Sequence, residues 1–217
     1  MKEKDALIIF AKAPVPGQVK TRLQPHLSPE ECANLHAFFI IDTINIAKRA
    51  EEAETFLFCY PGTENHFFQK VSKDFDIKLM SQKGNDLGER MEHAIKSSIS
   101  KGYNKVVIIG SDSPDLPVEY IQNGFKRLDT SDMVIGPSAD GGYYLIGGTK
   151  ELPVFDGIQW SGCQVFNMTV EKAKERGLTV SILDEWYDID TVEDLQRLNN
   201  SRSSKLDFLV ESTSTDL

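Results

Sequence analysis

Positively charged side chains gather in one proline-containing segment near the N-terminus. Lys12, Lys20 and Arg22 lie within residues 12–23, together with two prolines and Gly17. Arginine can chelate two phosphate oxygens, lysine acts as a point charge, and glycine lets the backbone approach a ligand. The G-x-x-x-x-G-K-[ST] pattern of a Walker phosphate loop is absent. The segment therefore predicts contacts to the phosphates of a small anionic ligand, with a solvated loop of incidental charges as the alternative.

Carboxylates that suit a divalent cation occur in two distant segments. Asp112 follows the apolar run at residues 105–109, and Asp188 and Asp190 follow the run at residues 178–183. Mg²⁺ takes one or two protein carboxylates and leaves its other positions to phosphates or water. If both runs are strands that end at one edge of a sheet, these carboxylates meet. We therefore expect them to hold Mg²⁺ or Mn²⁺, and turn formation and helix capping are the alternatives.

A glycine-containing segment could line the pocket of a second substrate. Asp140, Gly141, Gly142 and Tyr143 follow the apolar run at residues 133–135. Glycines would let backbone N–H groups meet a substrate rich in acceptors, with the tyrosine as an edge or stacking surface. An Asp-Gly pair is also typical of a β-hairpin turn. Both interpretations stay open.

Two further features carry weaker signals. Gly84 and Arg90 flank the start of a predicted helix, where a ribose or base contact and an ordinary helix cap fit equally well. Trp160 either fills the edge of the core or covers a substrate, and the core is the more common place for tryptophan.

Histidines and cysteines show no spacing that indicates metal binding. The four histidines are expected at the surface: His26, His36, His66 and His93. The three cysteines indicate neither a disulfide framework nor a zinc site, and buried small side chains are expected: Cys32, Cys59 and Cys163.

Short apolar runs alternate with helical patterns along the chain. Strands are expected at residues 5–11, 55–60, 77–80, 105–109, 133–135, 143–146 and 178–183. Helices are expected from residues 29 and 86 and at 64–75, 117–128, 165–176 and 191–198. Such alternation predicts an α/β fold, a single three-layer α/β/α domain with a mostly parallel sheet. In open sheets of this kind, ligands bind beyond the carboxyl ends of the strands.

Length and composition limit the domain organisation and the class of partner. The 217 residues, 40% of them hydrophobic and 26% charged, predict one globular domain at residues 1–200 and a polar tail at 201–217, where 206–210 could dock as a strand. A net charge of −9 disfavours nucleic acids and anionic membranes as partners. No apolar run approaches the roughly 18 residues of a membrane span, and without a signal-like segment a cytoplasmic location is the default expectation.

Taken in order, five segments resemble a bacterial family of nucleotide-diphospho-sugar transferases, over about residues 5–198. The segments are residues 11–23, 84–91, 110–116, 140–147 and 188–195. Some members of the family are named as glycosyltransferases of arsenosugar biosynthesis. The family is similar in fold to type-A glycosyltransferases, to molybdenum-cofactor guanylyltransferase and to 2-phospholactate guanylyltransferase.

The resemblance implies roles for individual residues of this chain. Contacts to the nucleotide and its phosphates would come from Lys12, Gly17, Lys20, Arg22, Gly84 and Arg90. Catalysis would depend on Lys20, Arg22 and Asp112, and the metal would be held by Asp112, Asp188 and Asp190. The acceptor or sugar pocket would be lined by Asp140, Gly141, Gly142, Tyr143 and Trp160.

The activity expected from these features is Mg²⁺-dependent transfer from a nucleotide-activated donor to a small-molecule acceptor. With the resemblance, a glycosyltransferase acting from a nucleotide-diphospho-sugar is the first expectation. A nucleotidyltransferase that joins a nucleoside triphosphate to a small phosphorylated acceptor and releases diphosphate is the alternative, and the cationic segment fits it at least as well. A nucleotide-binding protein without turnover is a third possibility, because no general base stands out.

Overall fold

The computed structural model describes residues 4–51, 53–160 and 162–201. The strand expected at residues 206–210 lies outside the described residues. No helix among those described is both long and apolar enough to cross a membrane.

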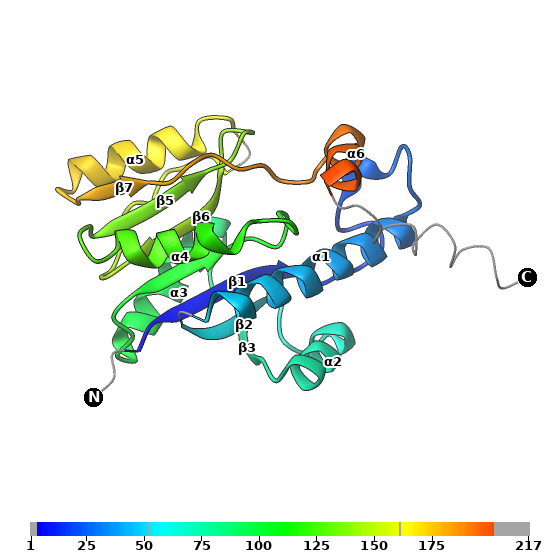
Figure 1. Cartoon of the computed structure of the whole chain (residues 1–217), viewed down its shortest axis with the longest axis horizontal. Helices are drawn as coiled ribbons and strands as arrows, with labels where there is room; N and C mark the ends of the chain where they lie inside the picture. The colour runs from blue at the N-terminus through cyan, green and yellow to red at the C-terminus, as the bar shows by residue number, and fades with distance from the viewer. Residues whose placement is uncertain (1–3, 52, 161, 202–217) are drawn as a thin grey trace, which may run out of the picture.

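A seven-stranded sheet forms the centre of the fold (Figure 1). Its strands are β1 (Ala6–Lys12), β2 (Glu54–Tyr60), β3 (Lys78–Ser81), β4 (Val106–Ile109), β5 (Met133–Pro137), β6 (Tyr143–Gly148) and β7 (Val180–Ile182). They lie in the order β3-β2-β1-β4-β6-β5-β7. Only β6 runs antiparallel to its neighbours, β4 and β5, while the other pairs are parallel. The prediction of a mostly parallel sheet is confirmed.

Helices cover both faces of this sheet and give three layers. The helices are α1 (Pro29–Ala50), α2 (His66–Phe75), α3 (Leu87–Ser100), α4 (Val118–Arg127), α5 (Val165–Glu175) and α6 (Val192–Ser201), with a 3₁₀ turn at Thr21–Leu23. Apolar side chains of α1, α2 and α4 share one core with the sheet, and those of α3 and α5 share the other. The predicted α/β/α domain is confirmed.

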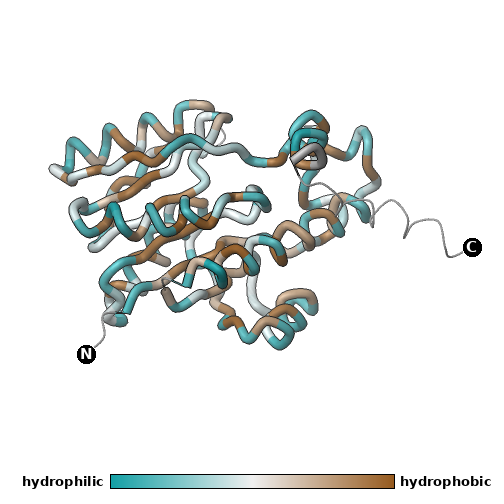
Figure 2. Tube along the Cα trace, in the orientation of Figure 1, coloured by the Kyte–Doolittle hydropathy of each residue, from teal (hydrophilic) through white to brown (hydrophobic). Residues whose placement is uncertain are grey.

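Strand β1 is buried on both faces of the sheet, and its continuous apolar sequence fits this position. Leu7 and Ile9 belong to the core under α1, whereas Ile8 and Phe10 belong to the core under α3. Successive strand side chains point to opposite faces, so a strand covered on both sides must be apolar throughout. Figure 2 shows the same contrast, with hydrophobic strands at the centre and mixed hydropathy along the covering helices.

A third, smaller cluster lies beyond the sheet, where α6 packs beside the first turns of α1 (Figure 1). Its buried members are Leu23, Cys32, Leu35, Phe39, Tyr187, Ile189 and Leu198. The 3₁₀ turn supplies Leu23, and the segment that leads into α6 supplies Tyr187 and Ile189. This packing fixes the C-terminal segment at residues 186–190 against the loop that follows β1.

The cysteine prediction holds for two positions and is wrong for the third. Cys32 and Cys59 are buried and free. Cys163 is exposed, because it lies in the irregular turn before α5, where its backbone packs against Gly141.

Candidate functional site

The order of strands creates a cleft between β1 and β4. From β1 the chain continues to β2 and β3 on one side, and from β4 the sheet continues to β6 on the other. The loops that leave these two neighbouring strands therefore diverge, which is the usual position of a ligand site in such sheets. A pocket of about 440 Å³ lies here, and five of the predicted site residues line it: Lys12, Arg90, Asp112, Tyr143 and Asp188.

Lys20 lies at the centre of the charged part of this site. Its side chain is only 3% exposed. The ammonium Nζ is 2.6 Å from Asp112 Oδ1 and 3.2 Å from Asp190 Oδ1, and it donates to the carbonyl oxygen of Ile189 at 2.6 Å. An ammonium group has three protons, so these three acceptors use all of them. The loop after β1 thus joins β4 and the C-terminal segment through one side chain.

The pKa values of this cluster follow from its mixed charges. Burial by itself would lower the pKa of Lys20, but the carboxylates of Asp112 and Asp190 outweigh it and raise the pKa above its ordinary value. Desolvation would likewise raise the pKa of Asp112, but the Lys20 ammonium holds it below the usual value. Lys20 and Asp112 therefore stabilise each other in their charged forms.

Arg22, Lys12 and Gly17 lie nearer to solvent. The Arg22 side chain is 70% exposed, and its Nη1 is 3.1 Å from Asp190 Oδ2. Lys12 Nζ donates to the carbonyl oxygen of Gln18 at 2.7 Å. Gly17 has a φ of +76° and no atom within 4 Å of a Cβ built on it. The loop therefore places the Lys12 cation at the pocket wall, while Arg22 and Gly17 are exposed and do not line the pocket.

Asp188 occupies a different environment from the other two carboxylates. Ser113 Oγ donates to its Oδ1 at 2.6 Å, and Ser138 Oγ donates to its Oδ2 at 2.9 Å. Burial raises the pKa of Asp188 to about 6; the negative charges of Asp112 and Asp140 add to the shift, and the serine hydrogen bonds oppose it. Asp188 is thus a fixed carboxylate that can take up a proton close to neutral pH.

The carboxylates fit a divalent cation only in part. Asp112 and Asp190 both lie within 3.2 Å of one nitrogen, so they are close enough to share a cation, and in this structure that cation is the Lys20 ammonium. Both oxygens of Asp188 already accept hydrogen bonds. Within the described residues, no three acidic, histidine or cysteine side chains form a metal-binding group. For Mg²⁺, the chain thus offers two carboxylates, Asp112 and Asp190, and substrate phosphates would complete the site.

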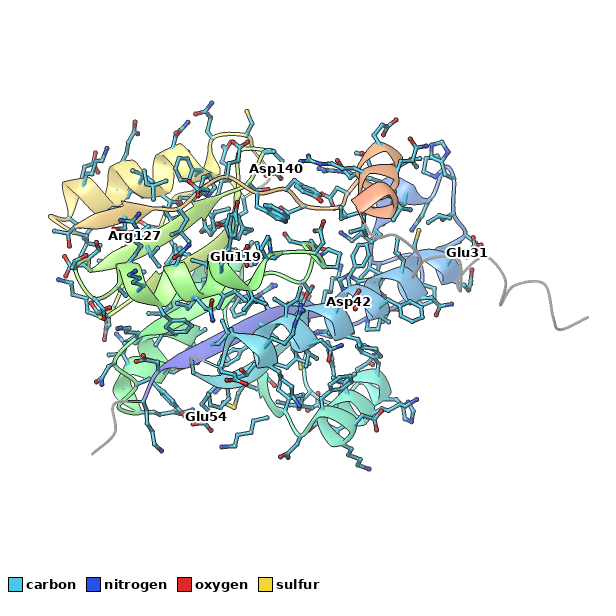
Figure 3. All side chains as sticks on the ribbon, viewed as in Figure 1. Glu31, Asp42, Glu54, Glu119, Arg127 and Asp140 are labelled. Atoms are coloured by element: carbon cyan, nitrogen blue, oxygen red, sulfur yellow. The ribbon has the colours of Figure 1, made fainter. Side chains whose placement is uncertain are left out.

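The segment at residues 138–142 forms the hairpin between β5 and β6, and Asp140 lies at its exposed tip (Figure 3). Gly141 donates its N–H to the carbonyl oxygen of Ser138 at 3.0 Å, and Gly142 N–H donates to Asp140 Oδ1 at 2.9 Å. A Cβ on Gly141 would lie 2.1 Å from the carbonyl oxygen of Cys163. The expected role of Gly141 as a pocket glycine is therefore corrected, because protein backbone fills the space that a ligand would need.

Tyr143 and Trp160 separate in the structure. Tyr143 lines the pocket, and its hydroxyl lies 3.8 Å from Met91 Sδ. Trp160 packs with Phe155, their ring centroids 6.2 Å apart, and covers Gly88 at the start of α3. Trp160 is not among the residues that line the pocket. Trp160 was expected in the acceptor pocket, with the edge of the core as the alternative. The structure places it at the edge of the core, because the space beside Gly88 accommodates the ring.

Gly84 and Arg90 flank the start of α3, where Asp86 caps the helix by accepting from Glu89 N–H at 2.8 Å. Arg90 Nε donates to the carbonyl oxygen of Gly84 at 3.2 Å. The guanidinium lies 3.8 Å from the centroid of the Tyr60 ring, and both side chains line the pocket. The segment therefore combines an ordinary cap with a cation at the pocket wall.

His36, expected at the surface, is instead buried in the pocket wall, and its side chain is 5% exposed. Its Nε2 lies 3.0 Å from the carbonyl oxygen of Lys12, and its Nδ1 lies 3.8 Å from Asp112 Oδ1. Burial lowers the pKa of His36. The negative charge of Asp112 opposes this shift, and the positive charge of Lys20 adds to it. Helical spacing from Ala33 and Ile40, both buried, was the signal in the sequence that could have placed it inward.

Two solved structures with the same fold are named as transferases. A crystal structure of a putative nucleotide-diphospho-sugar transferase from Desulfovibrio desulfuricans G20 is 37% identical, with a TM-score of 0.85 over 94% of this chain and 90% of that one. A nucleotidyl transferase from Methanothermobacter thermautotrophicus is 14% identical, with a TM-score of 0.61 over 91% of this chain and 97% of that one. The second likeness concerns the fold alone.

A curated relative adds a name for its reaction. The 2-phospho-L-lactate guanylyltransferase of M. thermautotrophicus is 28% identical over 183 residues, which are 81% of this chain and 76% of that protein. Three further relatives have the same name, and together the four confirm the prediction that the chain is a transferase.

The family itself is shown by a match over more than half of the sequence. Residues 43–162 match the family described as "Uncharacterized protein conserved in bacteria (DUF2064)". The matched part includes β4, Asp112 and the β5–β6 hairpin, and the 37% identical structure extends the likeness over the remaining site segments. The chain therefore belongs to the DUF2064 family and has the nucleotide-diphospho-sugar transferase fold.

Proposed function

We propose that the chain is a nucleotidyltransferase, which joins a nucleoside triphosphate to a small phosphorylated acceptor and releases diphosphate. The observation that carries the proposal is the buried Lys20 ammonium, which lies between Asp112 and Asp190 and shares Asp190 with the exposed Arg22. Asp112 also lines the pocket, together with the Lys12 cation. A triphosphate brings more negative charge than a sugar diphosphate, and this loop supplies cations for it. Four curated guanylyltransferases among the relatives support the same reaction class.

The residues of this chain would act mainly through charge. Fixed cations near the leaving diphosphate stabilise the negative charge that develops there, without reorganisation during the reaction. Arg22 can bind two phosphate oxygens at once, while Lys20 would exchange one of its carboxylate contacts for a phosphate. Asp112 and Asp190 would hold Mg²⁺, which would supply further positive charge at the phosphates.

Transfer of a sugar from a nucleotide-diphospho-sugar is the second candidate. Two observations favour it: the name of the 37% identical structure, and Asp188, whose raised pKa suits a base that accepts a proton from an acceptor hydroxyl. A phosphorylated acceptor needs no such base, because its phosphate is already ionised. The two candidates therefore differ in the product that leaves the enzyme.

The test measures that product. Purified protein with Mg²⁺ is incubated with each of the four nucleoside triphosphates and a set of small phosphorylated acceptors that begins with 2-phospholactate, and released diphosphate is assayed. We expect diphosphate in equal amount to a nucleotidylated acceptor, and neither product from Asp112→Asn. Release of nucleoside diphosphate from UDP- or GDP-sugars, without diphosphate from any triphosphate, would establish the second candidate instead. Metal-dependent nucleotide binding with no product in either assay would indicate a binding protein.

A further inference from the structure

Lys20 occupies the position between two carboxylates that a metal ion would need. Its Nζ lies 2.6 Å from Asp112 Oδ1 and 3.2 Å from Asp190 Oδ1. The Lys20 side chain is 3% exposed, and the Phe39 ring lies 5.3 Å from Nζ. The side chains of Asp112 and Asp190 are 45% and 37% exposed, so an ion from solvent can reach them. The ammonium is therefore the buried member of this cluster, and the carboxylates are its accessible members.

The backbone and the hydrogen bonds of Lys20 hold the ammonium in this place. Lys20 has a φ of 47°, in the left-handed region that is unfavourable for a residue with a Cβ. Nζ also donates to the carbonyl oxygen of Ile189 at 2.6 Å, so all three of its protons are used. The loop after β1 thus keeps an unfavourable backbone conformation at the residue whose side chain fills the site.

A second cation binds poorly to these carboxylates while the ammonium is present. An ion bound to Asp112 and Asp190 would lie within a few ångströms of Nζ, where like charges repel. Asp190 Oδ2 is also occupied, because Arg22 Nη1 lies 3.1 Å away. Phosphate oxygens change this balance, since they are strong acceptors for an ammonium group. A nucleotide that draws the ammonium to its phosphates would therefore leave both carboxylates to the metal ion.

We propose that Lys20 closes the metal site of the free protein and opens it when the nucleotide binds. The lysine thus makes the divalent ion bind together with the nucleotide rather than before it. The inference deepens the proposed function and rests on it for the presence of a nucleotide. It holds for either candidate reaction, because triphosphates and nucleotide-diphospho-sugars both carry phosphates that can take the ammonium.

Removal of the ammonium separates this role from a merely structural one. Lys20→Met keeps an unbranched side chain of similar length and has no charge. Without the cation, Asp112 and Asp190 are two like charges side by side, and a divalent ion relieves their repulsion. The variant should therefore bind a free metal ion more tightly and the metal–nucleotide complex more weakly. If Lys20 only stabilised the local structure, its removal would weaken both.

The first experiment measures binding of Mn²⁺, which stands in for Mg²⁺, to the whole chain without nucleotide. Free Mn²⁺ is counted by electron paramagnetic resonance with wild type, Asp112→Asn, Lys20→Met and the variant that combines both substitutions. We expect Lys20→Met to bind Mn²⁺ about tenfold more tightly than wild type, or better, because one like charge is gone. The combined variant should lose this site. Wild type and Asp112→Asn should bind Mn²⁺ equally, as a closed site requires.

The second experiment adds the nucleotide. Thermal shift identifies which of the four triphosphates binds best, and calorimetry measures its affinity with and without Mn²⁺. In wild type, Mn²⁺ should strengthen nucleotide binding, because each ligand favours the open site. In Asp112→Asn, Mn²⁺ should have little effect. Lys20→Met should bind the Mn²⁺–nucleotide complex more weakly than wild type does.

Opposite results overturn the inference separately from the proposed function. A Mn²⁺ site in wild type that Asp112→Asn removes, or an unchanged Mn²⁺ affinity in Lys20→Met, would show that the lysine does not close the site. If Lys20→Met does not fold, wild type and Asp112→Asn decide alone, because nucleotide binding by wild type that ignores Mn²⁺ also contradicts the inference. A wild type that binds none of the four triphosphates would contradict the proposed function, whereas the Mn²⁺ titrations would still support or overturn the closed site.

Discussion

The loop after β1 and the hairpin between β5 and β6 use similar sequence features for opposite purposes. Both follow a buried strand, and both contain a glycine with positive φ, Gly17 and Gly141. The space beside Gly17 is open, and the loop sends the Lys20 ammonium into the site. The space beside Gly141 is filled by the backbone of Cys163, and the hairpin contributes the neutral Ser138 hydroxyl. A glycine before a ligand site can therefore serve packing as readily as binding.

The two segments also give different properties to the carboxylates they touch. The loop after β1 places the Lys20 ammonium between Asp112 and Asp190, and the pKa of Asp112 falls below its ordinary value. The β5–β6 hairpin holds Asp188 through the neutral Ser138 hydroxyl, and the pKa of Asp188 rises to about 6 because of burial. The hairpin thus supports a carboxylate, Asp188, that takes up a proton more readily than usual. The loop supports one, Asp112, that takes up a proton less readily.

The largest expected effect comes from the same substitution in both segments. Gly141→Ala should lower the free energy of unfolding by about 3 kcal/mol or more, since a Cβ would lie 2.1 Å from a carbonyl oxygen and the backbone must shift. Gly17→Ala is the matched control, and it should cost only about 1 kcal/mol from its positive φ. Urea unfolding of both variants measures the difference. Equal losses would mean that Gly141 tolerates a side chain and that the contrast between the segments is wrong.

Removal of the Lys20 ammonium should affect binding more than removal of the exposed Arg22 guanidinium. Lys20→Met should weaken Mg²⁺-nucleotide binding about tenfold or more, because a charge-assisted contact to phosphate is lost from a buried position. Arg22→Met should weaken it about twofold to fivefold, because solvent screens an exposed charge. Calorimetric titration of both variants gives the ratio. Unchanged affinity in Lys20→Met would remove this side chain from the nucleotide site.

The raised pKa of Asp188 predicts a pH dependence of stability. Its native value of about 6 exceeds the ordinary 3.8, so the native state binds this proton more tightly than the unfolded state. The stabilisation is complete below about pH 4 and is lost as the pH rises through about 6. Relative to Asp188→Asn, wild type should therefore lose about 1 kcal/mol between pH 5 and pH 7.5. Parallel pH dependences of the two proteins in chemical unfolding would show that Asp188 has an ordinary pKa.

The smallest effect sharpens the role of the hairpin. Ser138→Ala removes a hydroxyl that donates to Asp188 Oδ2, and this hydrogen bond favours the ionised carboxylate. The pKa of Asp188 should therefore rise further, while the pKa of Asp112 should not change. Carboxyl chemical shifts followed by NMR across the pH range measure both groups. A fall in the pKa of Asp188 would mean that the hydroxyl does not support the carboxylate.

Much of the architecture was predictable, because local patterns carry it. The apolar run of β1 predicts a strand buried on both faces. Ser28 before Pro29 predicts the start of α1, and the structure shows the full capping box, with Ser28 Oγ accepting from Glu31 N–H. Thr191, just before α6, gives the same kind of signal, and in the structure its Oγ1 accepts from Asp194 N–H at 3.3 Å. These signals depend on contacts within a few residues, so the sequence alone contains them.

The site was predictable only in outline. The positions of Asp112 and Asp190 beyond two strand ends indicated that they would meet, and both contact Lys20. The sequence did not indicate that a lysine would lie between them, nor that His36 would face Asp112. Both facts depend on contacts between segments that are far apart in sequence, such as the small cluster that packs Tyr187 and Ile189 against Leu23 and the start of α1.

By itself, the sequence determined the alternation of strands and helices, the concentration of cations before Leu23 and the carboxylates beyond the strands, since each needs only residue type and spacing. Only the tertiary structure decided which carboxylates are neutralised and which glycine faces open space. The physical reason is that charge pairing and packing act through space, between segments such as Lys20 and Asp190 that are 170 residues apart.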